Sequence, residues 1–124
     1  MLLQGLNYGT DYSTFIKISD RFENYKFLNP QLPQKYFGNV PNKPSVIPDG
    51  FKKIKSENTF RVFALGGSTT AGFPHPPNGS FPRLLKRYLS WNYPKIDFEL
   101  INLGMSAINT ITIRDIINDV LEES

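Results

Sequence analysis

A serine that follows two glycines at the end of a short apolar run is the side chain best placed for nucleophilic chemistry. The run FRVFAL, from Phe60 to Leu65, leads directly into Gly66, Gly67 and Ser68. In open α/β sheets the reactive groups lie in loops at the carboxyl ends of the strands. Because glycines let the backbone turn tightly there, we expect an exposed Ser68 hydroxyl. Its own backbone N–H is then available to an oxyanion.

Three other interpretations of this glycine-rich turn fail on spacing. A P-loop needs a lysine after its last glycine, but Phe73 follows Gly72. Gly66, Gly67 and Gly72 do not form the dinucleotide-binding pattern GxGxxG. The nucleophile elbow GxSxG needs a glycine where Thr70 stands. What remains is a Gly-Gly-Ser-Thr turn that follows a strand.

Each candidate side chain also has an ordinary structural interpretation. Ser68 fits a tight turn or the cap of a following helix. His75 is the only histidine and lies in the proline-rich segment FPHPPNG. The prolines restrict the backbone there, and nothing in the sequence directs the imidazole toward Ser68. An exposed loop histidine is therefore favoured over a general base. Asn102 and Asn109 fit a strand terminator and a helix cap equally well.

The elements that must position these residues alternate between strand and helix from residue 59 onward. FRVFAL and DFELIN, the latter ending at Asn102, read as buried strands. Ser80 is a plausible cap for a first helix, and Thr110 or Asn109 for a second. An apolar stripe faces the core in each helix. The stripes are Phe81, Leu84, Leu85, Tyr88 and Leu89, then Ile113, Ile116, Ile117, Val120 and Leu121.

The order strand, helix, strand, helix predicts an α/β fold with a parallel sheet, because a helical crossover joins parallel strands. We expect the start of a doubly wound sheet within residues 59–124. Such sheets usually carry about five strands, so the sequence is expected to be the N-terminal portion of a larger domain. Its exposed sheet edge predicts self-association.

Residues 1–58 form a lead-in that is rich in aromatics and prolines and shows no helical period. Short strands and extended loops are expected here. TFIKI (residues 14–18) and NYKFL (residues 24–28) could pair as a hairpin. Residues 29–50 are expected to be irregular and to wrap another surface, with aromatic side chains as packing anchors.

Composition narrows the function classes further. A chain of 124 residues that is 40% hydrophobic and 20% charged is typical of one globular folding unit. The net charge is +3, but the only tight basic cluster consists of Lys52, Lys53 and Lys55. We interpret this cluster as a solvent-exposed segment that leads into the sheet, so no nucleic-acid partner is expected.

Metal sites, disulfides and membrane segments are also not expected. The chain has no cysteine and a single histidine, which excludes disulfides and argues against zinc. No apolar run approaches the roughly 20 residues of a membrane span. The opening MLLQGLNYGTDY is too short and too polar for a signal peptide.

Taken together, FRVFALGGSTTAGFP, SFPRLLKRYL and DFELINLGMSAINT resemble the opening of the SGNH hydrolases, also called GDSL-like lipases and esterases. The resemblance covers residues 59 to 124, and the aromatic lead-in is similar, less specifically, to that of a subgroup of the family. It implies a flavodoxin-like sheet and cleavage of carboxylic esters or acyl groups by a serine nucleophile.

The resemblance assigns roles to individual residues. Ser68 is the nucleophile, although Gly-Gly-Ser departs from the commoner Gly-Asp-Ser, and its backbone N–H is one oxyanion donor. The second donor falls on Ala107, with Gly104 as the alternative if the loop is shifted. The remaining residues of the two loops would support the site: Gly66, Gly67, Thr69 and Asn109.

The family's third-block asparagine and its Asp-x-x-His block have no counterpart in this sequence. A serine without its base loses several orders of magnitude in rate, so the chain itself is expected to be inactive. The parent is expected to act without metal or cofactor on a small-molecule, lipid or carbohydrate ester, in an extracytoplasmic or membrane-anchored setting. The alternative is a non-catalytic binding or interaction module that uses the same pocket.

Overall fold

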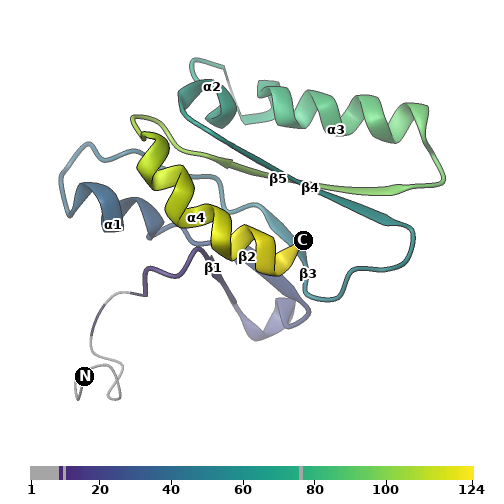
Figure 1. The fold of residues 1–124 in the computed structure, drawn as a ribbon, viewed down its shortest axis with the longest axis horizontal. Coiled ribbons are helices and arrows are strands. Elements are labelled where there is room, and N and C mark those ends of the chain that lie inside the picture. Colours follow the sequence, from purple (N-terminus) through teal and green to yellow (C-terminus); the bar gives the residue numbers. More distant parts are fainter. Residues whose placement is uncertain (1–8, 10, 76) are drawn as a thin grey trace.

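The computed structural model describes Gly9, residues 11–75 and residues 77–124, apart from the side chain of Pro77. Residues 1–8, the larger part of the opening segment analysed above, lie outside this range. The described chain is a mixed α/β structure with two sheets (Figure 1). The strands are β1 (Phe15–Ile16), β2 (Tyr25–Leu28), β3 (Gly50–Lys52), β4 (Thr59–Gly66) and β5 (Asp97–Gly104). The helices are α1 (Leu32–Phe37), α2 (Ser68–Ala71), α3 (Phe81–Asn92) and α4 (Thr110–Glu123), with 3-10 turns at Asp20–Phe22 and Pro77–Gly79.

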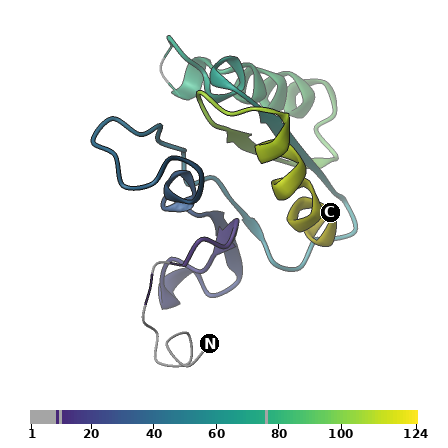
Figure 2. The same cartoon turned by 60° about the vertical axis from the view of Figure 1, so that its left-hand side comes forward.

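The predicted parallel pair is confirmed. β4 and β5 run in register from Thr59 opposite Asp97 to Gly66 opposite Gly104. Helix α3 covers one face of this pair, while α4 and the antiparallel sheet lie on the other (Figure 2). The three layers thus place the N-terminal lead-in against the sheet that carries the candidate site.

The lead-in contains the predicted hairpin and one helix that was not predicted. β1 pairs antiparallel with β2, Phe15 opposite Leu28, and β3 adds a third strand. The expectation that residues 29–50 are irregular was wrong for α1. Pro33 lies in the first turn of this helix, where no N–H is needed. The prolines of this segment led to the prediction of extended chain, although Pro33 is compatible with the first turn of α1.

One hydrophobic core joins the two halves of the chain. Leu28, Leu32 and Phe51 come from the lead-in, and they meet buried residues of β5 and α4: Ile101, Leu103, Met105, Ile116 and Val120. The Phe51 ring packs edge-on against Phe15 and Phe63, with centroids 5.1 and 5.4 Å apart. Several lead-in aromatics are packing anchors, as predicted.

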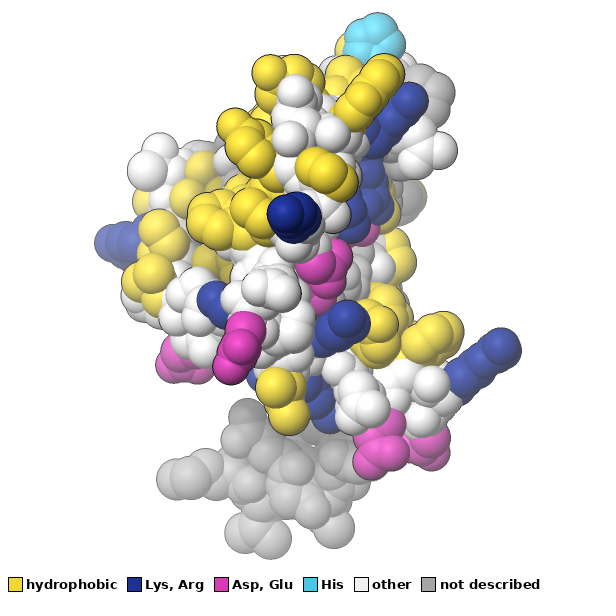
Figure 3. Space-filling view, turned by 90° about the vertical axis from the view of Figure 1, so that its right-hand side faces the viewer, with side chains coloured by type: hydrophobic (Ala, Val, Ile, Leu, Met, Phe, Trp, Pro, Cys, Tyr) yellow, Lys and Arg dark blue, Asp and Glu magenta, His cyan; other side chains and the backbone are white. Residues whose placement is uncertain are grey.

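The apolar stripe of α3 does not face a core, which corrects the prediction. Phe81, Leu84 and Tyr88 are 49%, 51% and 64% exposed. Hydrophobic side chains gather on the upper part of the molecule, the part that contains α3 (Figure 3). A pair of strands is too narrow to cover the stripe, since α3 packs mainly against β5 and no described strand lies beyond β4. None of the described helices combines the length and apolar character needed to cross a bilayer.

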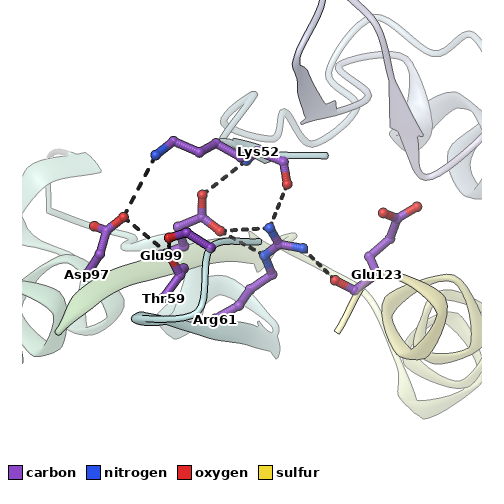
Figure 4. Close-up of polar contacts among 7 residues, drawn as sticks. Lys52, Thr59, Arg61, Asp97, Glu99 and Glu123 are labelled. Atoms are coloured by element: carbon purple, nitrogen blue, oxygen red, sulfur yellow. Dashed lines mark hydrogen bonds and ion pairs between the residues drawn. The ribbon is translucent and has the colours of Figure 1, made fainter. Parts of the chain in front are cut away.

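A buried ion pair ties the lead-in to the amino-terminal half of the parallel sheet. The Arg61 guanidinium of β4 donates to Glu99 of β5 at 2.8 Å, and these side chains are 3% and 11% exposed. Arg61 also donates to the carbonyl oxygens of Lys52 (2.6 Å) and Glu123 (2.7 Å), so it links β3 to the end of α4 (Figure 4). Its guanidinium carbon lies 4.6 Å from the centroid of the Phe51 ring.

We expect Arg61→Met to lower the free energy of unfolding by about 3–5 kcal/mol, because Glu99 would be left buried and unpaired. Urea denaturation measures this change. The double variant Arg61→Met/Glu99→Leu should recover most of the loss, since apolar replacement of a buried pair is often neutral.

Lys17→Ala is the matched control, because it breaks the Lys17–Asp20 pair, in which Asp20 is 99% exposed. That change should stay within about 1 kcal/mol. An Arg61→Met loss no larger than that of Lys17→Ala would show that the buried pair does not hold the two halves together.

Candidate functional site

The two loops that carry the candidate residues leave the same edge of the parallel sheet. β4 and β5 end opposite each other at Gly66 and Gly104, and the Met105 N–H donates to the Gly66 carbonyl at 3.0 Å. Helix α2 and the loop before α4 therefore lie at one end of the sheet (Figure 1). This is the carboxyl edge at which α/β proteins place reactive groups.

Ser68 is the first residue of α2 and is exposed. Its carbonyl oxygen accepts from the Gly72 and Phe73 N–H groups at 3.0 and 2.9 Å, which closes the short helix. Gly72 has a φ of 108° and turns the chain out of α2. Among the described residues, no side-chain hydrogen bond engages the Ser68 hydroxyl. The structure thus presents an open hydroxyl at the strand end, as the sequence predicts.

Gly66 and Gly104 are required because α2 lies directly against the strand ends. A Cβ at Gly104 would lie 2.2 Å from the Ala71 nitrogen, and a Cβ at Gly66 would lie 2.1 Å from the Thr70 hydroxyl oxygen. A Cβ at Gly67 would meet nothing within 4 Å. Gly66 and Gly104 therefore allow α2 to lie against the ends of β4 and β5, and this close packing fixes the position of Ser68.

Asn102 is the buried polar residue that holds this corner together. It is 2% exposed, and its amide donates to the Thr70 carbonyl at 2.8 Å while its side-chain oxygen accepts from the Gly104 N–H at 2.8 Å. The amide also lies 3.5 Å from the Ser80 hydroxyl. Asn102 therefore joins α2, β5 and the start of α3, a role beyond that of a strand terminator. The signal in the sequence is a polar amide inside an apolar strand.

Asp49 is a buried carboxylate that sequence reasoning missed. It accepts from the Asn102 N–H at 2.9 Å and pairs with Arg83 of α3. The lead-in thereby satisfies a backbone donor on the outer edge of β5, and Lys52 N–H adds a bond to Glu99 at 3.0 Å further along. The sequence Pro48-Asp49-Gly50 is typical of a turn. This local pattern gives no indication that Asp49 accepts a hydrogen bond from β5.

The loop after β5 contains the residue expected to donate to an oxyanion. Ala107 has a φ of 60°, in the left-handed region that non-glycine residues seldom adopt. Asn109 caps α4, since its side chain accepts from the Ile111 and Thr112 N–H groups at 3.0 and 3.2 Å. Asn109 therefore orders the loop from its far end.

The remaining predicted residues lie around a small cleft or on the surface beside it. A cleft of about 200 Å³ is lined by Ser45, Ile47, Ala71, Phe73, His75, Gly104 and Ser106. His75 is exposed, and its backbone N–H donates to the Gly72 carbonyl at 2.7 Å. Thr69 is exposed beside Ser68. The described part of the chain contains no cluster of three or more His, Asp or Glu side chains that could hold a metal ion.

Comparisons with known proteins do not connect the chain to a family. No family model matches it, and neither a curated protein nor a solved structure does.

We expect Gly104→Ala to destabilise the protein by about 1–3 kcal/mol, because the added methyl group collides with the backbone of α2, which cannot rotate away. Gly67→Ala is the matched control and should change stability by no more than about 0.5 kcal/mol, since its methyl group meets open space. Thermal and urea unfolding measure both variants. Equal losses would mean that α2 is not packed against β5 as described.

Proposed function

We propose that this chain is the nucleophile-bearing part of an SGNH-type serine hydrolase with a doubly wound, flavodoxin-like sheet, acting on carboxylic esters. The observation that carries the proposal is the exposed Ser68 at the carboxyl end of β4, beside the loop that follows β5. In this arrangement Ser68 attacks the ester carbonyl and forms an acyl-enzyme. The alcohol leaves with a proton, and water then releases the acid.

The geometry of the two loops supports a particular oxyanion donor. The Gly104 N–H already donates to Asn102, which favours Ala107 over Gly104 for this role. Successive N–H groups in a turn with a left-handed residue form a concavity that binds anions, and Ala107 supplies such a residue. Backbone donors of this kind typically contribute about 3–4 kcal/mol of transition-state stabilisation.

The base for Ser68 is assigned to structure beyond the described residues. The only histidine, His75, makes no described side-chain hydrogen bond to Ser68. No described strand pairs with the outer edge of β4, and the apolar stripe of α3 is exposed. Both are surfaces of the kind on which further strands and helices pack in parallel α/β sheets. We place the base and the third oxyanion donor in such elements.

A non-catalytic interaction module is the second candidate. The observation that favours it is the same exposed stripe of α3, together with Phe60, which is 58% exposed on β4. Apolar surface of this kind marks protein contacts when no further part of the domain covers it.

We expect the full product of the gene that encodes this chain to react with a fluorophosphonate at Ser68, because such probes phosphonylate activated serines. Mass spectrometry of the proteolysed product locates the adduct. Ser68→Ala should abolish labelling, and Ser90→Ala, at an exposed serine of α3, should leave it unchanged.

Labelling that survives Ser68→Ala would refute the nucleophile assignment. A folded full product that self-associates and ignores the probe would support the interaction module instead.

The 124-residue chain alone should hydrolyse p-nitrophenyl acetate no faster than its Ser68→Ala variant, since a serine without a base loses several orders of magnitude in rate. Initial rates measured by absorbance test this expectation. A rate at least tenfold above that of Ser68→Ala, lost again in His75→Ala, would make His75 the base and overturn the assignment of the base to other elements.

A further inference from the structure

The cleft beside Ser68 has a wall that the lead-in provides. Ser45 and Ile47 form this side, Ala71 and Phe73 form the side of α2 and its following loop, and Gly104 and Ser106 come from the end of β5. Residues from three separate parts of the chain thus converge on one small space. Asp49, two residues after Ile47, accepts from the Asn102 N–H and fastens this part of the lead-in to β5.

Ser68 lies within reach of this cleft by helix geometry. Ser68 and Ala71 are three residues apart on α2, and side chains at this spacing are surface neighbours with Cβ atoms about 5–6 Å apart. Ser106 in the cleft wall directly precedes Ala107. The cleft therefore adjoins both the helix that carries Ser68 and the loop that contains Ala107.

The size and chemistry of the cleft select a small neutral group. A volume of about 200 Å³ has room for about six water-sized groups at roughly 30 Å³ each. The lining contains no Asp, Glu, Lys or Arg, and His75 is the one basic side chain in it. Ile47, Ala71 and Phe73 provide apolar walls, and Phe73 is 73% exposed at this position.

We propose that this cleft binds the acyl group of the substrate and limits it to about four carbons, which together with the two ester oxygens account for the roughly six groups that the volume holds. Ile47 of the lead-in and Phe73 are the residues that set the length. The identification of the cleft as the acyl site of an enzyme rests on the proposed esterase function. The binding of a short neutral acyl compound in the cleft does not depend on that function and can be tested separately. An eight-carbon chain has more groups than this volume holds, so its far end would lie outside the cleft.

Binding can be tested without catalysis on the 124-residue chain labelled with ¹⁵N. Butyramide is the probe, because it carries the four-carbon acyl group and is not an ester. We expect saturable amide shifts at Ala71, Phe73 and Gly104, unchanged in Ser90→Ala, and at least fivefold weaker binding of octanamide. Shifts that do not saturate, or that spread evenly over the molecule, would overturn the site.

Two variants test the walls. Ile47→Trp fills the cleft and should weaken butyramide binding at least tenfold, whereas Ile54→Trp, at an isoleucine that is 86% exposed outside this cleft, should not. Phe73→Ala removes an exposed wall without burying a cavity and should weaken binding at least fivefold. Unaltered binding in both Ile47→Trp and Phe73→Ala would refute the assignment, even if one of them were poorly folded.

The full gene product separates this inference from the proposed function. If Ser68 is labelled but butyrate and octanoate esters are hydrolysed at equal rates in wild type and Ile47→Trp, the acyl-length assignment fails and the esterase stands. If butyramide binds as expected but Ser68 is never labelled, the esterase fails and the cleft remains a binding site for small neutral acyl compounds.

Discussion

The parallel pairing of β4 with β5 leaves two sheet faces to be covered, and the arrangement of the rest of the chain follows from this constraint. Parallel strands are stable when both faces are buried. Helix α3 takes one face, while α4 and the antiparallel sheet of the lead-in take the other. The lead-in is therefore part of the core, through Leu28, Leu32 and Phe51, and it also satisfies the outer edge of β5 through Asp49. The opposite edge, along β4, has no described strand.

Two clusters of buried polar groups join separate elements of this structure. Arg61 and Glu99 link β3, β4, β5 and α4 at one end of the sheet, and Asn102 links α2, β5 and α3 at the other. Each buried donor or acceptor that lost its partner would cost about 1–3 kcal/mol, more when charged. These two clusters therefore restrict how the layers can slide. The candidate site at the carboxyl edge inherits its geometry from the second cluster.

At the candidate site, α2 packs tightly against the strand ends while its first residue, Ser68, is exposed to solvent. Gly66 and Gly104 bring α2 within backbone contact of the strand ends, and Ser68 then emerges into solvent at the first residue of the helix. Such an arrangement fixes the position of a hydroxyl without burying it, which suits a nucleophile that must meet its substrate. It also brings the lead-in residue Ile47 to a cleft beside Ala71.

Sequence alone determined the elements whose signals are local. The apolar run before Gly66, the helical periods of α3 and α4, and the hairpin of β1 with β2 follow from side-chain spacing, because alternation and the 3.6-residue period reflect which side of an element is buried. Spacing could not show what each apolar stripe meets, so the exposed face of α3 was mispredicted. Tertiary structure alone decided the partners of Asp49 and Asn102 and the wall that Ile47 forms, because these contacts join residues far apart in the chain. Their energies depend on distances that exist only once the layers have packed.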